Sequence, residues 1–88
     1  MTHILVVEDE QSYRDPLTYL LEREGYQVTA VASGTEALAV CERAMPDLIL
    51  LDLMLPGLSG VEVCRRIRLT SSVPVIMLTA KDSEIDKV

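Results

Sequence analysis

The sequence predicts an α/β domain in which a parallel sheet is covered by helices on both faces. Four short apolar runs recur along the chain, and segments with helical periodicity separate them. The third run, residues 48–51, has four apolar residues in succession, which is typical of a strand buried on both faces. Strands that alternate with helices are joined by right-handed crossovers, and these crossovers produce a parallel sheet.

Length and composition favour one small globular domain. The chain has 88 residues, of which 49% are hydrophobic, enough for a modest core. Fourteen acidic residues against eight basic ones give a formal net charge of -6. A nucleic-acid-binding surface needs positive charge, so this composition argues against one. No apolar run approaches the roughly 20 residues that cross a bilayer, and the N-terminus does not read as a signal peptide. We therefore expect a cytoplasmic protein without a membrane partner.

The few histidine and cysteine residues exclude several kinds of site. The single histidine, His3, cannot build a histidine-based metal site or a Ser-His triad. Cys41 and Cys64 are too few and too far apart for a disulfide framework or a metal clip. Both fall on predicted helices in apolar phase, and we expect them to be plain buried thiols.

The first strand is predicted at residues 4–7 and is followed by an amphipathic helix that Gly25 ends. Either Ser12 or Asp15 caps this helix. Ser12 is preferred, because the earlier start brings Tyr13 onto the apolar face. The other members of that face are Leu17, Leu20 and Leu21.

The second strand and second helix have clear boundaries. Residues 27–31 form a more polar strand, suited to a sheet edge. Ser33 and Glu36 have the spacing of a capping box, so a helix is expected to begin there and to end before Pro46. Its inward face carries Ala37, Leu38 and Cys41.

The third helix and fourth strand follow the same pattern. Ser59 and Glu62 make a second capping box. The inward face of the helix is predicted to carry Val61, Cys64 and Ile67, and its exposed side Arg65, Arg66 and Arg68. The arginines suit the last turns, where cations meet the negative end of the helix dipole. Residues 73–78 form a strand with Pro74 near its start, where proline is tolerated.

The last residues, 83–88, begin like a further helix and stop after one turn, which is too short for a stable isolated helix. The fourth strand would then be an open sheet edge, and open edges pair with other chains. We therefore expect the chain to be part of a longer domain, and a fragment of this length to self-associate through that edge.

Polar side chains close three of the predicted strands. Glu8 and Asp9 follow the first, Asp52 follows the third and Thr79 follows the fourth. The carboxyl ends of parallel strands lie at one edge of the sheet, so these groups can converge. Clustered carboxylates repel one another, and a hard cation such as Mg²⁺ relieves that repulsion. The alternative is that the three acids are ordinary loop residues of an acidic protein.

Three motifs carry a resemblance to a known family: residues 6–10, with the acidic pair, residues 51–60 around Asp52, and residues 74–80. In this order and spacing they resemble the receiver domain of bacterial two-component response regulators, over the whole 88 residues. The type most similar is the OmpR/PhoB-type transcriptional regulator, in particular an actinobacterial phosphate-responsive one. The resemblance implies a flavodoxin-like fold with strand order 2-1-3-4-5, of which residues 1–88 are the N-terminal part, incomplete at the C-terminus.

The resemblance also implies a role for each site residue. Asp52 is the phosphoacceptor and takes a phosphoryl group from a phosphohistidine on a sensor histidine kinase. Asp9, supported by Glu8, holds Mg²⁺ together with Asp52 and the backbone carbonyl of Met54. Thr79 forms a hydrogen bond with the phosphoryl group. The chain would thus be a signalling phosphoacceptor rather than an enzyme. It would control transcription and meet DNA only through an effector domain outside these residues.

Two other interpretations stay open at this point. A phosphohydrolase of the haloacid dehalogenase type needs a second acid two residues after its nucleophile, and this chain has Met54 there. The other is a truncated receiver fragment that self-associates and does not signal. It is considered because the family's invariant lysine and switch aromatic belong to a fifth strand beyond these residues; Lys81 is not that lysine.

Overall fold

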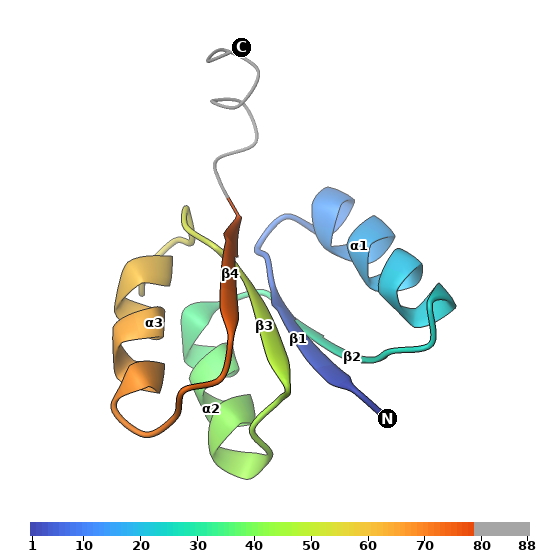
Figure 1. Cartoon of the computed structure of the whole chain (residues 1–88). Coiled ribbons are helices and arrows are strands. Elements are labelled where there is room, and N and C mark those ends of the chain that lie inside the picture. The colour runs from blue at the N-terminus through green and yellow to red at the C-terminus, as the bar shows by residue number, and fades with distance from the viewer. Residues whose placement is uncertain (79–88) are drawn as a thin grey trace, which may run out of the picture.

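The computed structural model describes residues 1–78, in which three helices and four strands alternate (Figure 1). In chain order the elements are β1 (His3–Val7), α1 (Gln11–Arg23), β2 (Gln27–Val31), α2 (Gly34–Arg43), β3 (Leu48–Asp52), α3 (Gly60–Arg68) and β4 (Val75–Leu78). The predicted helical start at residues 83–88 lies outside the described residues. No helix in the described part is long and apolar enough to span a bilayer.

All strand pairs within residues 1–78 are parallel, and the strand order is β2-β1-β3-β4. The predicted parallel α/β fold is therefore confirmed, and this order agrees with the first four strands of the implied flavodoxin-like arrangement. The polar strand β2 lies at an edge, as predicted. β4 begins at Val75, two residues later than predicted, because Pro74 has no N–H to donate. The Pro74 carbonyl still accepts a hydrogen bond from the Ile49 amide (3.0 Å).

Helices cover both faces of the sheet, with α1 on one face and α2 and α3 on the other (Figure 1). The alternation of side chains along each strand divides the core into two clusters. The larger cluster lies under α2 and α3 and includes Val40, Val63 and Ile67. The smaller cluster contains Ile4, Val6 and Leu50, and Leu17 and Leu21 of α1 pack against it.

The start of α1 differs from both sequence alternatives, since neither Ser12 nor Asp15 caps it. The N-cap is Glu10, which provides no side-chain cap. With this start, Leu17 and Leu21 face the sheet, whereas Tyr13 and Leu20 are about half exposed, at 46% and 54%. The prediction that Tyr13 and Leu20 belong to the buried face was therefore wrong.

The other helix ends follow the sequence closely. Gly25 ends α1 with φ of +96°, and its amide and that of Tyr26 bond back into the last turn, the Schellman arrangement. Ser33 and Ser59 cap α2 and α3 as predicted, each accepting a hydrogen bond of 3.2 Å from the amide three residues later.

The inward face of α3 was predicted one position out of phase at its start. Val61 is 62% exposed, whereas Val63 and Ile67 are buried and Cys64 is partly buried. The phase follows from Gly60, the first residue of the helix, which lies directly against the end of β3. Cys41, on α2, is buried as predicted, and burial raises the pKa of its thiol.

Candidate functional site

Three carboxylates meet at the carboxyl edge of the sheet. β1 and β3 are adjacent and parallel, with Val7 opposite Leu51. Glu8 and Asp52 come directly after these two residues and therefore lie side by side at the edge of the sheet. Asp9 follows Glu8. One ligand oxygen from each acid lies within 4.8 Å of the other two. The predicted convergence of Glu8, Asp9 and Asp52 is thus present in the folded chain.

These acids differ from ordinary loop residues in their burial. Asp52 is fully buried, Glu8 is 2% exposed and Asp9 is half-buried. Loop acids without a function are normally solvated, because removing an ionised carboxylate from water is costly. Three such groups within 4.8 Å of one another also repel. A positive charge bound among them would offset both costs.

Local hydrogen bonds orient two of the three side chains. Asp52 Oδ1 accepts from the amide of Met54 (3.0 Å), and Glu8 Oε2 accepts from the amide of Glu10 (3.0 Å). The Met54 side chain is 65% exposed, and the contact of this residue with Asp52 is made by its backbone amide. The expected role of its carbonyl as a metal ligand stays a prediction. The amide of Leu53 continues the β3–β4 ladder one residue past Asp52, by bonding to the carbonyl of Leu78 (3.2 Å). The backbone around Asp52 is therefore held on both sides of the residue.

Two further residues shape the site, and sequence reasoning gave neither of them a role. Gly60 approaches the end of β3 so closely that an added Cβ would overlap the Asp52 carbonyl oxygen. Arg14, in the second turn of α1, donates from Nη1 to the carbonyls of Glu8 (2.9 Å) and Asp9 (3.3 Å). Gly60 was visible only as part of the matched motif around Asp52. No local pattern distinguishes Arg14 from the other arginines of the chain.

One predicted site residue is not placed, because Thr79 lies outside the described residues. Leu78, the last described residue, pairs with Asp52 in the sheet register. The hydrogen bond expected from Thr79 to a phosphoryl group therefore stays a prediction.

The donor set of this pocket fits a hard divalent cation. All three side chains offer carboxylate oxygens, which Mg²⁺ prefers, and Mg²⁺ commonly uses one or two carboxylates together with water and phosphate oxygens. The described residues bring no histidine or cysteine into the cluster, so a soft metal does not fit.

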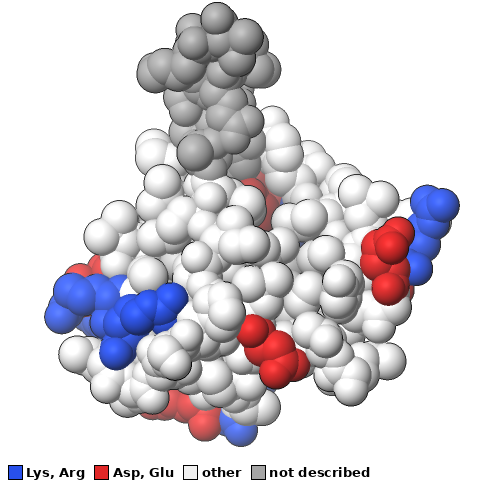
Figure 2. Space-filling view, viewed as in Figure 1, with Lys and Arg blue, Asp and Glu red and all other residues white. Residues whose placement is uncertain are grey.

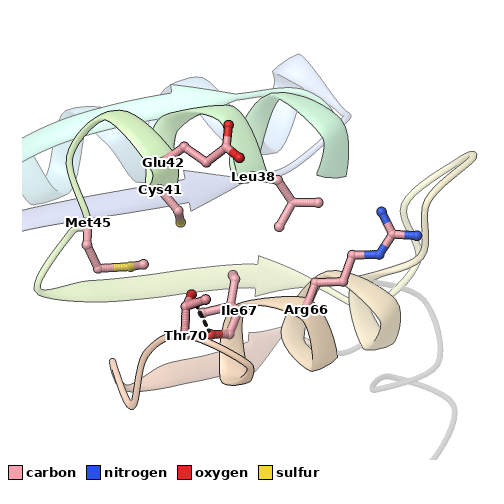
Figure 3. Close-up of a pocket in the computed structure, with 7 residues that line it drawn as sticks. All are labelled: Leu38, Cys41, Glu42, Met45, Arg66, Ile67 and Thr70. Atoms are coloured by element: carbon pink, nitrogen blue, oxygen red, sulfur yellow. Dashed lines mark hydrogen bonds between the residues drawn. The ribbon is translucent and has the colours of Figure 1, made fainter.

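A second hollow, of about 330 Å³, lies between α2 and α3 (Figure 3). Its lining is mostly apolar and consists of Leu38, Cys41, Glu42, Met45, Arg66, Ile67 and Thr70. None of the three clustered acids lines it. This hollow is therefore separate from the acidic pocket.

Basic side chains gather on the surface over α3 (Figure 2), and the last turn of this helix carries the three predicted arginines, Arg65, Arg66 and Arg68. Two of them are engaged with an acid of the same helix. Arg65 Nη2 lies 2.6 Å and Arg66 Nε 2.8 Å from Glu62 Oε2. Hydrogen bonds from these two guanidinium groups lower the pKa of Glu62 to about 2. The ion pairs complement the helix dipole at the surface, which agrees with a solvated role for these side chains.

Fold and pocket together define a class of protein: a doubly wound α/β domain with an acidic pocket at the edge of the sheet where such folds bind ligands. Comparison with known families makes the class specific. The response regulator receiver domain matches residues 4–88, and the chain belongs to this family.

Two curated relatives illustrate the relationship. The sensory transduction protein RegX3 of Mycolicibacterium smegmatis is 60% identical over 88 residues, which cover all of this chain and 39% of RegX3. The DNA-binding response regulator MtrA of Mycobacterium leprae is 48% identical over 85 residues, 97% of this chain and 38% of MtrA. The predicted resemblance to receiver domains is therefore confirmed. The chain spans about two-fifths of the length of these relatives.

A solved structure supports the same assignment. The response regulator protein TrrA from Thermotoga maritima, crystallised in complex with Mg²⁺-BeF, has a TM-score of 0.86 and 37% sequence identity. The match covers 100% of this chain and 77% of the TrrA chain. The described strands and helices are therefore those of a receiver fold.

Proposed function

We propose that this chain is the phosphoacceptor part of a response regulator and that Asp52 takes the phosphoryl group. The observation that carries the proposal is the convergence of Glu8, Asp9 and Asp52 within 4.8 Å at the carboxyl edge of the sheet. Asp52 is 0% exposed, the most deeply buried member of this cluster, and it terminates a central strand. A carboxylate held rigidly in this way is a suitable nucleophile for an in-line transfer.

The proposed reaction moves a phosphoryl group from a histidine to an aspartate. One Asp52 carboxylate oxygen attacks phosphorus, a P–O bond forms, and the P–N bond to the donor imidazole breaks. The imidazole nitrogen keeps the electron pair and takes up a proton. Asp52 Oδ1 already accepts a hydrogen bond from the Met54 amide (3.0 Å), which restrains the orientation of the carboxylate.

The residues that would hold Mg²⁺ are Glu8, Asp9, Asp52 and the backbone carbonyl of Met54. When bound, this ion would neutralise charge on the phosphoryl oxygens. The role of the chain's own residues is to hold hard oxygen ligands close together and largely shielded from water. The complex of TrrA with Mg²⁺-BeF supports the proposal by analogy. Thr79 would complete the site with a hydrogen bond to the phosphoryl group.

The partners follow from the same proposal. The donor would be a sensor histidine kinase, and residues 1–88 would be the N-terminal part of a receiver domain. An effector domain beyond these residues would bind DNA, by analogy with the relative MtrA, which is a DNA-binding response regulator. The chain's own net charge of -6 does not suit DNA binding, which supports assigning DNA binding to a separate effector domain. Such a regulator would work in the cytoplasm, where the chromosome is.

The test is covalent labelling of the full gene product that contains this chain. Incubation with acetyl phosphate and Mg²⁺, followed by intact-mass spectrometry, is expected to show one phosphoryl adduct. Asp52→Asn removes the nucleophile and should abolish the adduct, whereas Asp15→Asn, an exposed acid of α1, should retain it. An unlabelled wild-type protein, or an adduct that survives Asp52→Asn, would show that the proposal is wrong.

A second candidate property is self-association of the 88-residue chain through β4. Within residues 1–78, β4 pairs with β3 alone, and Ile76 is 51% exposed on it. Exposed apolar edge strands pair readily with other chains. Sedimentation velocity over a range of concentrations tests this property, and a monomer at every concentration would refute it.

A further inference from the structure

Arg14 occupies an unusual position beside the acidic pocket. It is half-buried in the second turn of α1, and its Nη1 donates to two successive backbone carbonyls, those of Glu8 (2.9 Å) and Asp9 (3.3 Å). These are the two acids that follow β1. We propose that Arg14 is a positioning residue for the cation site, an inference that rests on the proposed function. It holds the backbone of Glu8 and Asp9 so that their carboxylates point at a common cation.

The connection between β1 and α1 needs such a tie. Only residues 8–10 join the two elements, and the helix N-cap Glu10 makes no side-chain cap bond. Glu8 is held to β2 by its amide, which bonds to the Val31 carbonyl (3.1 Å), and its side chain turns back to the Glu10 amide (3.0 Å). Arg14 adds a bond to the Asp9 carbonyl and so extends this support to the half-buried member of the cluster.

Arg14 donates to backbone carbonyls and not to carboxylates, which explains why an arginine beside the pocket is compatible with cation binding. A guanidinium paired with the carboxylates would compete with a cation for the same oxygens. The two Arg14 bonds are made to backbone oxygens and do not use those ligand atoms. The Arg14 backbone is itself anchored, because its carbonyl accepts a hydrogen bond from the Thr18 hydroxyl (2.8 Å).

Positioning and simple electrostatics predict opposite results, which makes the inference testable. If Arg14 acted only as a positive charge near the site, its removal would strengthen the binding of Mg²⁺, because like charges repel. If it positions Glu8 and Asp9, its removal weakens binding, as loss of residues that orient metal ligands generally does. The sign of the change in affinity therefore separates the two roles.

The experiment compares Mg²⁺ binding by Arg14→Ala with that of the wild-type gene product, using competition with Mn²⁺ followed by electron paramagnetic resonance. We expect Arg14→Ala to weaken binding about tenfold. Arg14→Lys keeps a charged donor, and its Mg²⁺ affinity should lie between those of the wild type and Arg14→Ala. The matched control is Arg23→Ala, which removes an arginine from the last turn of the same helix and should leave affinity unchanged.

A second measurement needs no metal. In metal-free protein, Arg14→Ala should speed amide hydrogen exchange at Asp9 and Glu10, while amides of the buried strand β3 exchange as in the wild type. A uniform increase would indicate global destabilisation and would contradict a positioning role. If Arg14→Ala does not fold, Arg14→Lys is compared with Arg23→Lys. Because lysine keeps the positive charge, a role through charge alone predicts an unchanged Mg²⁺ affinity for Arg14→Lys, whereas the positioning role predicts weaker binding.

The outcomes distinguish this inference from the proposed function. A wild-type protein that binds no Mg²⁺ would refute the proposed cation site. A wild-type protein that binds Mg²⁺, with Arg14→Ala binding it equally well or more tightly, would refute the role of Arg14 and leave the site intact.

Discussion

Asp52 depends on its neighbours in the fold for both its place and its direction. The Met54 amide bonds to its side chain, and the first residue of α3, Gly60, lies against its carbonyl. A Cβ at Gly60 would also come within 2.9 Å of the Leu53 Cα. Because these neighbouring atoms belong to the backbone, they cannot move aside as a flexible side chain would. Glycine is therefore required at position 60 for a steric reason and not for its φ angle.

Gly60→Ala is expected to destabilise the protein by about 1–3 kcal/mol, the usual cost of forcing extra volume into a packed site. It should also slow phosphoryl uptake by Asp52, since the end of β3 must shift. Urea denaturation and the labelling reaction measure the two effects. Val61→Ala, at the next and exposed position, should change stability by no more than about 0.5 kcal/mol. Equal stability of the two variants would contradict the steric argument.

Among the elements, α3 shows how one helix serves both the core and the surface. Val63 and Ile67 bury its inner face, and Gly60 places its N-terminus against β3. On its outer side Glu62 accepts hydrogen bonds from Arg65 and Arg66, with spacings of three and four residues. Pairs at these spacings lie on the same side of a helix and stabilise it modestly.

The pKa of Glu62 makes the stability of α3 depend on pH. The arginines lower this pKa from an ordinary value of 4.5 to about 2, so the folded state favours the ionised form. The contribution is therefore complete above about pH 4.5 and is lost as pH falls toward about 2. We expect Glu62→Gln to be less stable than wild type at neutral pH, with a difference that shrinks across this interval.

Urea denaturation at several pH values measures that difference. The effect should be small and should weaken with added salt, because the ion pairs are exposed to solvent. Glu42→Gln, on the surface of α2, is the control and should show no such narrowing. A difference between Glu62→Gln and wild type that stays constant down to about pH 2 would contradict the assignment.

In the whole molecule the two faces of the sheet are covered unequally. Two helices cover one face over the larger core cluster, and α1 alone covers the other within the described part of the chain (Figure 1). Leu48 and Leu78 are only partly buried on this second face, and Ile76 is 51% exposed. Apolar surface of this kind is removed from water if a second molecule covers it.

Ile76→Lys is therefore expected to reduce self-association of the 88-residue chain, because a charge on an edge strand opposes pairing with another strand. Sedimentation velocity at increasing concentration should show a smaller fraction of dimers or larger species than wild type. Val61→Lys places the same charge at a similarly exposed position on α3 and should leave association unchanged. If both variants associate like the wild type, β4 is not the contact surface.

Much of this architecture follows from the sequence by itself. The alternation of apolar runs and helical periodicity predicted the parallel sheet, and the polar strand at residues 27–31 was correctly assigned to an edge. Ser33, Ser59 and Gly25 marked helix ends correctly. The helix ends can be predicted because they depend on bonds between residues a few positions apart, whose geometry is nearly the same in every protein. The parallel sheet could be predicted because strands that alternate with helices are joined by crossovers of one hand.

Tertiary structure alone decided the features that depend on distant residues. α1 begins at Gln11 rather than after Ser12, and its outward Tyr13 and inward Leu17 depend on how the helix meets the sheet. The role of Arg14 is equally invisible in sequence, since it consists of bonds to carbonyls that the turn after β1 presents. Periodicity gives the spacing of a helical face but not its phase relative to a neighbouring element. That phase is set by packing.

The acidic pocket combines both kinds of information. The residue types and their places at strand ends were readable from the sequence, and they sufficed to predict that Glu8, Asp9 and Asp52 converge. Their burial and their separation of less than 4.8 Å come from the pairing of β1 with β3, which brings together residues more than forty positions apart. The sequence determined which groups are available for chemistry. The fold decided their distance and exposure to water, because both depend on the backbone hydrogen bonds between strands.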